Sequence, residues 1–67
     1  MMAINFEWRS GILEAADTKT GIEWCWYKGD TEITRSRDGE LAGSVSVPPG
    51  ATVTDVKALI RDDARRP

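Results

Sequence analysis

The side chains that could do chemistry in this chain are charged ones, because histidine is absent and there is one cysteine. Without histidine, a Ser-His-Asp or Cys-His nucleophile system is excluded. One cysteine likewise rules out an internal disulfide and a zinc site of the Cys/His type within one chain. Cys25 stands between Trp24 and Trp26, where a thiol is best interpreted as a small apolar filler. We therefore expect no enzyme activity, no metal and no cofactor.

Glutamates recur once in each of four successive segments that alternate apolar and polar residues. They are Glu7, Glu14, Glu23 and Glu32. In a meander such segments are neighbouring strands, so we expect the four carboxylates to form a row on the outward face, with Tyr27 beside them. Like charges opposite one another destabilise a sheet, unless Arg9, Thr34 and Arg35 dilute them. The row either binds a basic partner or keeps an open face soluble.

A second charged set lies near the end of the chain. Lys57, Arg61 and Arg65, here called the basic stripe, recur every four residues. Together with Arg66, Arg35 and Arg37, they could grip phosphates. Against this, Asp62 and Asp63 dilute the stripe and the chain as a whole is acidic, whereas nucleic-acid modules usually carry excess positive charge. A solvated helix face is the alternative.

The elements that must position these residues are strands, followed by one helix. Period-2 alternation and β-branched or aromatic residues predict strands over residues 4–9, 12–16, 22–27, 31–36 and 41–47. Residues 12–16 are ambiguous, because Leu, Glu and Ala also favour helix. We interpret them as a strand, in which a one-residue slip would turn Glu14 inward.

The helix is predicted after Pro48-Pro49-Gly50, which stops the sheet. Thr52 is a suitable N-cap, and Asp55 three residues later resembles a capping box, with Asp where Glu or Gln is usual. An apolar stripe at helical spacing follows, formed by Val53, Val56, Leu59, Ile60 and Ala64.

The predicted fold class is α+β, a small antiparallel β-meander of about five strands with one C-terminal helix packed on one face. We expect a single domain over residues 1–67, with the sheet in 1–47, a turn at 48–51 and the helix at 52–65. The expected covered face holds Ile4, Phe6, Trp8, Leu13, Ile22, Trp24, Trp26, Ile33, Leu41, Val45 and Val47.

Length and charge set further bounds. The chain has 67 residues and a net charge of −2, too little for long-range steering. Domains this small are marginally stable, so a homodimer is one possibility. Met1-Met2-Ala3 begins no signal peptide, and no apolar run approaches the roughly 18 residues that span a bilayer. With a lone thiol, these features favour a cytoplasmic location and no membrane contact.

These observations lead to three expectations about function. The first is a non-enzymatic protein–protein interaction module that docks through Glu7, Glu14, Glu23, Tyr27 and Glu32. By analogy of size and composition, it could be a phage or mobile-element inhibitor of host machinery, as anti-CRISPR proteins are. The second is a nucleic-acid binder that uses Arg35, Arg37, Lys57, Arg61, Arg65 and Arg66. The third is an assembly subunit that pairs through an edge strand or Trp8.

Overall fold

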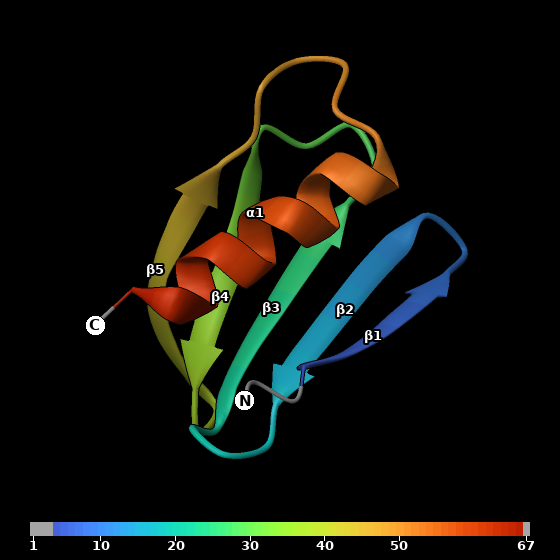
Figure 1. Ribbon diagram of the computed structural model, residues 1–67. Coiled ribbons are helices and arrows are strands. Elements are labelled where there is room, and N and C mark those ends of the chain that lie inside the picture. The colour runs from blue at the N-terminus through green and yellow to red at the C-terminus, as the bar shows by residue number, and fades with distance from the viewer. Residues whose placement is uncertain (1–3, 67) are drawn as a thin grey trace.

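The computed structural model describes residues 4–66 as a five-stranded antiparallel sheet with one helix (Figure 1). The elements are β1 (Ile4–Arg9), β2 (Ile12–Asp17), β3 (Ile22–Tyr27), β4 (Glu32–Arg37), β5 (Glu40–Ser46) and α1 (Val53–Arg65). The strands follow one another across the sheet in chain order, and α1 crosses one face diagonally. The predicted α+β meander is therefore confirmed. Met1-Met2-Ala3, on which the expectation about a signal peptide rests, lies outside the described residues.

The ambiguous segment at residues 12–16 is a strand in the predicted register. Leu13 and Ala15 are buried on the face that α1 covers, and Glu14 is exposed on the opposite face. We call these the covered face and the open face. The helical propensity of Leu, Glu and Ala yields here to pairing on both sides, because β2 lies between β1 and β3.

The core lies between the covered face and α1. Trp24 and Trp26 are its largest fully buried side chains, and Val56 and Ile60 are fully buried on the helix side. Both indole N–H groups keep a hydrogen bond when buried, as buried tryptophans usually do. Trp26 Nε1 donates to the carbonyl oxygen of Asp30 over 3.0 Å, and Trp24 Nε1 donates to a side chain described below.

The start of α1 has the predicted capping box. The backbone N–H of Asp55 donates to Thr52 Oγ1 over 3.1 Å, and the backbone N–H of Thr52 donates to Asp55 Oδ2 over 2.9 Å. The backbone bond from Thr52, and then the bond with its side chain, lower the pKa of Asp55. Two otherwise free groups at the helix start are satisfied in this way. In residues 4–66, no helix is long and apolar enough to cross a membrane.

Leu41 was wrongly expected on the covered face, whereas Trp8 lies there as expected but stays partly exposed. Leu41 is 76% exposed, because a β-bulge shifts the alternation of β5: Thr34 pairs with Ser44, but Ser36 pairs with Leu41. Leu41 thus shares the open face with Ser36 instead of joining Val45 and the buried Val47. Trp8 lies on the covered face and stacks against Trp26 with ring centroids 6.4 Å apart, yet it is 43% exposed.

Candidate interaction surfaces

The open face carries the predicted glutamates, but the strand register does not place them in a row. Glu7 is directly opposite Glu14, and the residue opposite Glu14 on β3 is Cys25. Glu23 lies two residues away, opposite Ala16. The prediction of a continuous row was wrong because a row needs one register position shared by all four strands. The carboxylates are instead spread over several levels of the sheet.

Cys25 is the centre of this arrangement. Glu14 faces it from β2 and Thr34 from β4, while Glu23 and Tyr27 flank it along β3. Burial raises the pKa of the Cys25 thiol, and the charges of Glu14 and then Asp30 raise it further. The thiol is therefore less ionised than a free cysteine, which makes it a poor nucleophile.

Small side chains form the floor of the open face. Ala16, Cys25 and Ser36 are half-buried and Thr34 is exposed. They line a shallow hollow of about 520 Å³ together with glutamates from β1, β2 and β3. At one corner, Ile12 is paired with Tyr27, which is 55% exposed. The face thus combines a low floor, carboxylates around it and one apolar corner.

Most of the open-face charge is uncompensated. Within residues 4–66 the ion pairs are Glu7 with Arg9, Arg35 with Asp63, and Asp62 with Arg66. Glu14, Glu23 and Glu32 are exposed and take part in none of these pairs. Of the four glutamates, Glu7 alone forms an ion pair within the described residues.

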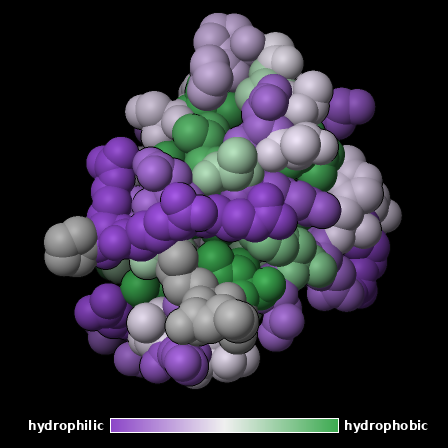
Figure 2. Space-filling view, viewed as in Figure 1, coloured by the Kyte–Doolittle hydropathy of each residue, from purple (hydrophilic) through white to green (hydrophobic). Residues whose placement is uncertain are grey.

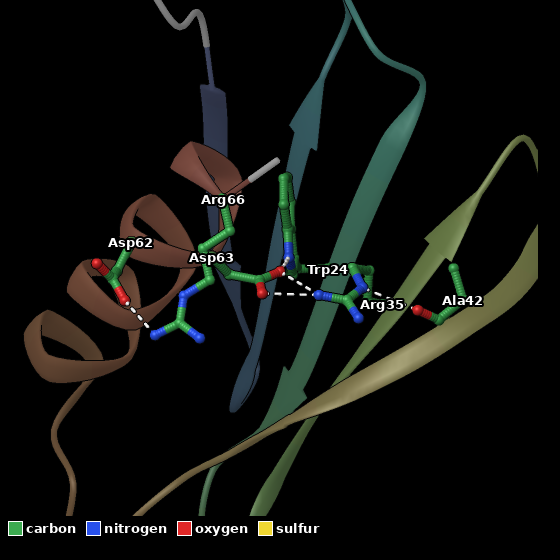
Figure 3. A network of polar contacts seen from close by, with 6 residues as sticks. All are labelled: Trp24, Arg35, Ala42, Asp62, Asp63 and Arg66. Carbon is green, nitrogen blue, oxygen red and sulfur yellow. Dashed lines mark hydrogen bonds and ion pairs between the residues drawn. The ribbon is translucent and has the colours of Figure 1, made fainter.

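Arg35 lies on the covered face, not among the open-face glutamates that it was expected to dilute. Its strand partner there is Trp24. Its Nη1 donates to both carboxylate oxygens of Asp63 over 2.7 Å, and its Nε donates to the carbonyl oxygen of Ala42 over 2.8 Å (Figure 3). Trp24 Nε1 donates to Asp63 Oδ2 over 2.9 Å. We call Trp24, Arg35 and Asp63 the Asp63 network.

The Asp63 carboxylate is stabilised by these donors. Its partial burial alone would raise its pKa, but the hydrogen bonds from Arg35 and Trp24 and the charges of Arg35 and Arg66 outweigh burial and lower the pKa. The side chain of Asp63 is 11% exposed and that of Arg35 is 29% exposed. The network is therefore partly buried and links β4 to the last turns of α1. Arg35 thus already has an anionic partner in Asp63, unlike the other candidate phosphate-binding residues on the helix side toward β1.

Gly43, at the bulge in β5, leaves space for the Arg35 side chain. Gly43 has φ +97°, and a Cβ there would lie 2.9 Å from Arg35 Nη2. A hollow of about 830 Å³ lies beside the network, between the end of α1 and strands β4 and β5. Arg37 and Arg66 line this hollow. They lie on the same side of α1 as the network.

The basic stripe lies on the other side of α1, toward β1. Lys57 Nζ is 5.5 Å from the centroid of the Phe6 ring, and Arg61 Cζ is 4.9 Å from it. Arg61 and Arg65 line one hollow with Phe6. Figure 2 shows hydrophilic side chains running in a band along α1 with apolar ones on either side. The structure thus brings Lys57, Arg61 and Arg65 together and separates them from Arg37 and Arg66.

The Asp63 network was not predicted from the sequence, although the positions of Arg35 and Asp63 in the sequence could have indicated it. Arg35 follows Ile33 by two residues and so shares its buried face, where a cation needs an anionic partner. Asp63 follows Ile60 by three residues, which places it on the apolar stripe of α1. A cation and a carboxylate that both interrupt apolar faces are candidates to form an ion pair with one another.

In the described part of the chain, no group of three or more Cys, Asp or Glu side chains is arranged to hold a metal ion. Comparison with protein-family models, with curated proteins and with solved structures found no match to this chain.

Proposed function

We propose that this protein is a non-enzymatic interaction module that docks its open face on a basic surface of another protein. The observation that carries the proposal is the state of Glu14, Glu23 and Glu32, which are exposed and take part in none of the ion pairs found in residues 4–66. Glu7 and Tyr27 complete the contact set. Cations on a partner would supply the charges that the face lacks.

The shape of the open face supports this proposal. A paired sheet holds its backbone in place, so little backbone entropy is lost when a partner binds. The small-residue floor around Cys25 lets partner side chains approach between the carboxylates. Tyr27 beside Ile12 offers an aromatic anchor, and tyrosines are enriched among residues that dominate binding energy.

The size of the molecule fits a single interface. It measures 30 × 23 × 22 Å, and a standard interface takes about 800 Å² from each partner. Such an interface would occupy most of one face. A partner with a basic surface could be a protein that itself binds nucleic acid. Occupying that surface would make this chain a competitive inhibitor, the form that phage and mobile-element inhibitors such as anti-CRISPR proteins can take.

A tagged pull-down from a bacterial lysate, with and without nuclease, tests the proposal. We expect one protein in stoichiometric amount that survives nuclease treatment and is released as salt rises. The same pull-down with the Glu14→Lys/Glu23→Lys variant should lose that protein. Recovery of only nuclease-sensitive material would contradict the proposal, as would retention of the same protein by the variant.

A further inference from the structure

A second charged surface lies on the other side of the sheet from the proposed docking face. Lys57, Arg61 and Arg65 follow the side of α1 that faces β1. A helix rises 1.5 Å per residue, so neighbouring cations in the stripe are about 6 Å apart along the axis. The three charges therefore form a nearly straight line.

The carboxylates that were expected to dilute this line are occupied elsewhere. Asp63 accepts hydrogen bonds from Arg35 and Trp24, and Asp62 pairs with Arg66 at 3.1 Å. Asp55 caps the helix start. No ion pair found within residues 4–66 includes a member of the basic stripe. The stripe is thus a local positive region on a chain of net charge −2.

Phe6 orders two of the three cations before any ligand arrives. Lys57 and Arg61 both lie over its ring, and cation–π contacts of this kind restrain long side chains. Less rotamer entropy is then lost on binding. A guanidinium that lies over a ring keeps N–H donors at its edge, where they suit phosphate oxygens.

We propose that the basic stripe binds the phosphate backbone of a nucleic acid without reading its sequence. A line of cations matches a linear polyanion, in which charges recur every 3.4 Å along each strand of a duplex. The open face of a second copy fits less well, because its glutamates lie at several levels of the sheet. A membrane surface is disfavoured, because an interfacial helix needs an outward apolar face and Val56 and Ile60 of α1 are buried.

This site is independent of the proposed docking face, since the two lie on opposite sides of the sheet. Fluorescence anisotropy with a labelled 20-base-pair duplex, titrated from 20 to 200 mM NaCl, measures binding at the stripe. Neutralising three phosphates predicts a slope of log K against log salt of about −2.7. The Kd should then rise about 500-fold across this tenfold range of salt.

Three variants separate this site from general electrostatics. Arg61→Gln/Arg65→Gln should bring the slope to about −0.9, because one phosphate contact remains. Lys28→Gln/Arg37→Gln removes the same charge from exposed side chains outside the stripe and should leave the slope unchanged. Arg65→Gln alone spares the contacts with Phe6 and should make the slope less negative by about 0.9. A thermal melt confirms that each variant folds.

Three results would overturn the proposal. The first is no binding by the wild-type chain at 20 mM NaCl. The second is an equal loss of binding in Arg61→Gln/Arg65→Gln and Lys28→Gln/Arg37→Gln. The third is self-association at low salt that Glu14→Lys abolishes, which would make a second copy the occupant of the stripe.

Discussion

Arg35 Nη1 lies 2.7 Å from both carboxylate oxygens of Asp63, which joins the fourth strand to the last turns of the helix. Trp24 donates to the same carboxylate from β3. The position of α1 on the sheet is thus set by apolar packing and by three polar bonds to one side chain. Because the carboxylate is only 11% exposed, loss of these bonds should affect stability more than loss of a surface ion pair.

Asp63→Ala should lower the free energy of unfolding by about 1–3 kcal/mol, because it leaves Trp24 Nε1 and Arg35 Nη1 without their acceptor. Asp62→Ala is the matched control. It removes a neighbouring carboxylate that forms an exposed pair with Arg66, and such pairs contribute about 0–1 kcal/mol. Urea unfolding followed by tryptophan fluorescence measures both. Equal losses would contradict the structural role of the Asp63 network.

The lowered pKa of Asp63 predicts an acid-dependent loss of stability. Its folded-state pKa lies below the value of about 3.9 for an unfolded aspartate. Its contribution is therefore fully present above about pH 4 and is lost as the pH falls through the folded-state pKa. Thermal melts from pH 2 to pH 6 of the wild-type chain and of Asp63→Asn should differ most at pH 6 and converge in acid. A constant difference across this range would contradict the pKa assignment.

Gly43→Ala should destabilise the fold more than Gly29→Ala. The two glycines have similar φ angles, +97° and +93°, and each substitution places a side chain in a strained backbone region at about 1–3 kcal/mol. At Gly29 the new Cβ has nothing within 4 Å, but at Gly43 it lies 2.9 Å from Arg35 Nη2. The difference in unfolding midpoint between the variants reports the displaced guanidinium. Equal midpoints would show that Arg35 moves without cost.

Cys25 should react slowly with alkylating reagents in the folded protein. Burial, Glu14 and Asp30 all raise its pKa, so the reactive thiolate is scarce at neutral pH. Iodoacetamide at pH 8 should modify the native chain more slowly than the chain in 8 M urea. Glu14→Gln should raise the native rate only in part, because burial is the larger cause. A native rate equal to that in urea would contradict the described environment.

The strands and the helix could be predicted because each is marked by residues close together in the sequence, through side-chain alternation or a helix cap. Alternation around Leu13 and Ala15 placed Glu14 outward even where propensity favoured helix. The pairing of Thr52 with Asp55 predicted the start of α1. Leu41 could not be placed, because the bulge between Leu41 and Ser44 reverses the alternation between the two ends of β5.

Relationships between distant residues were harder to predict. The alignment of the four open-face glutamates depends on the register between strands. Turn lengths set this register, whereas side-chain alternation shows only which face a residue occupies. Arg35 and Asp63 are 28 residues apart, and their contact depends on how α1 crosses the sheet. For the same reason, the six candidate phosphate-binding residues lie in three places: the basic stripe, the partly buried Asp63 network with Arg35, and the other side of α1 with Arg37 and Arg66.

Docking through the open face is tested by the affinity of the captured partner for three forms of the chain, measured by titration calorimetry. The forms are the wild type, Glu14→Lys/Glu23→Lys on the open face, and Glu40→Lys/Asp62→Lys at exposed positions away from that face with the same change in charge. We predict that the open-face variant binds at least about tenfold more weakly, since close interfacial charge pairs couple by about 1.5 kcal/mol or more, and that the control stays within about twofold of the wild type. Equal affinities for all three forms, or an equal loss in both variants, would contradict docking through the open face.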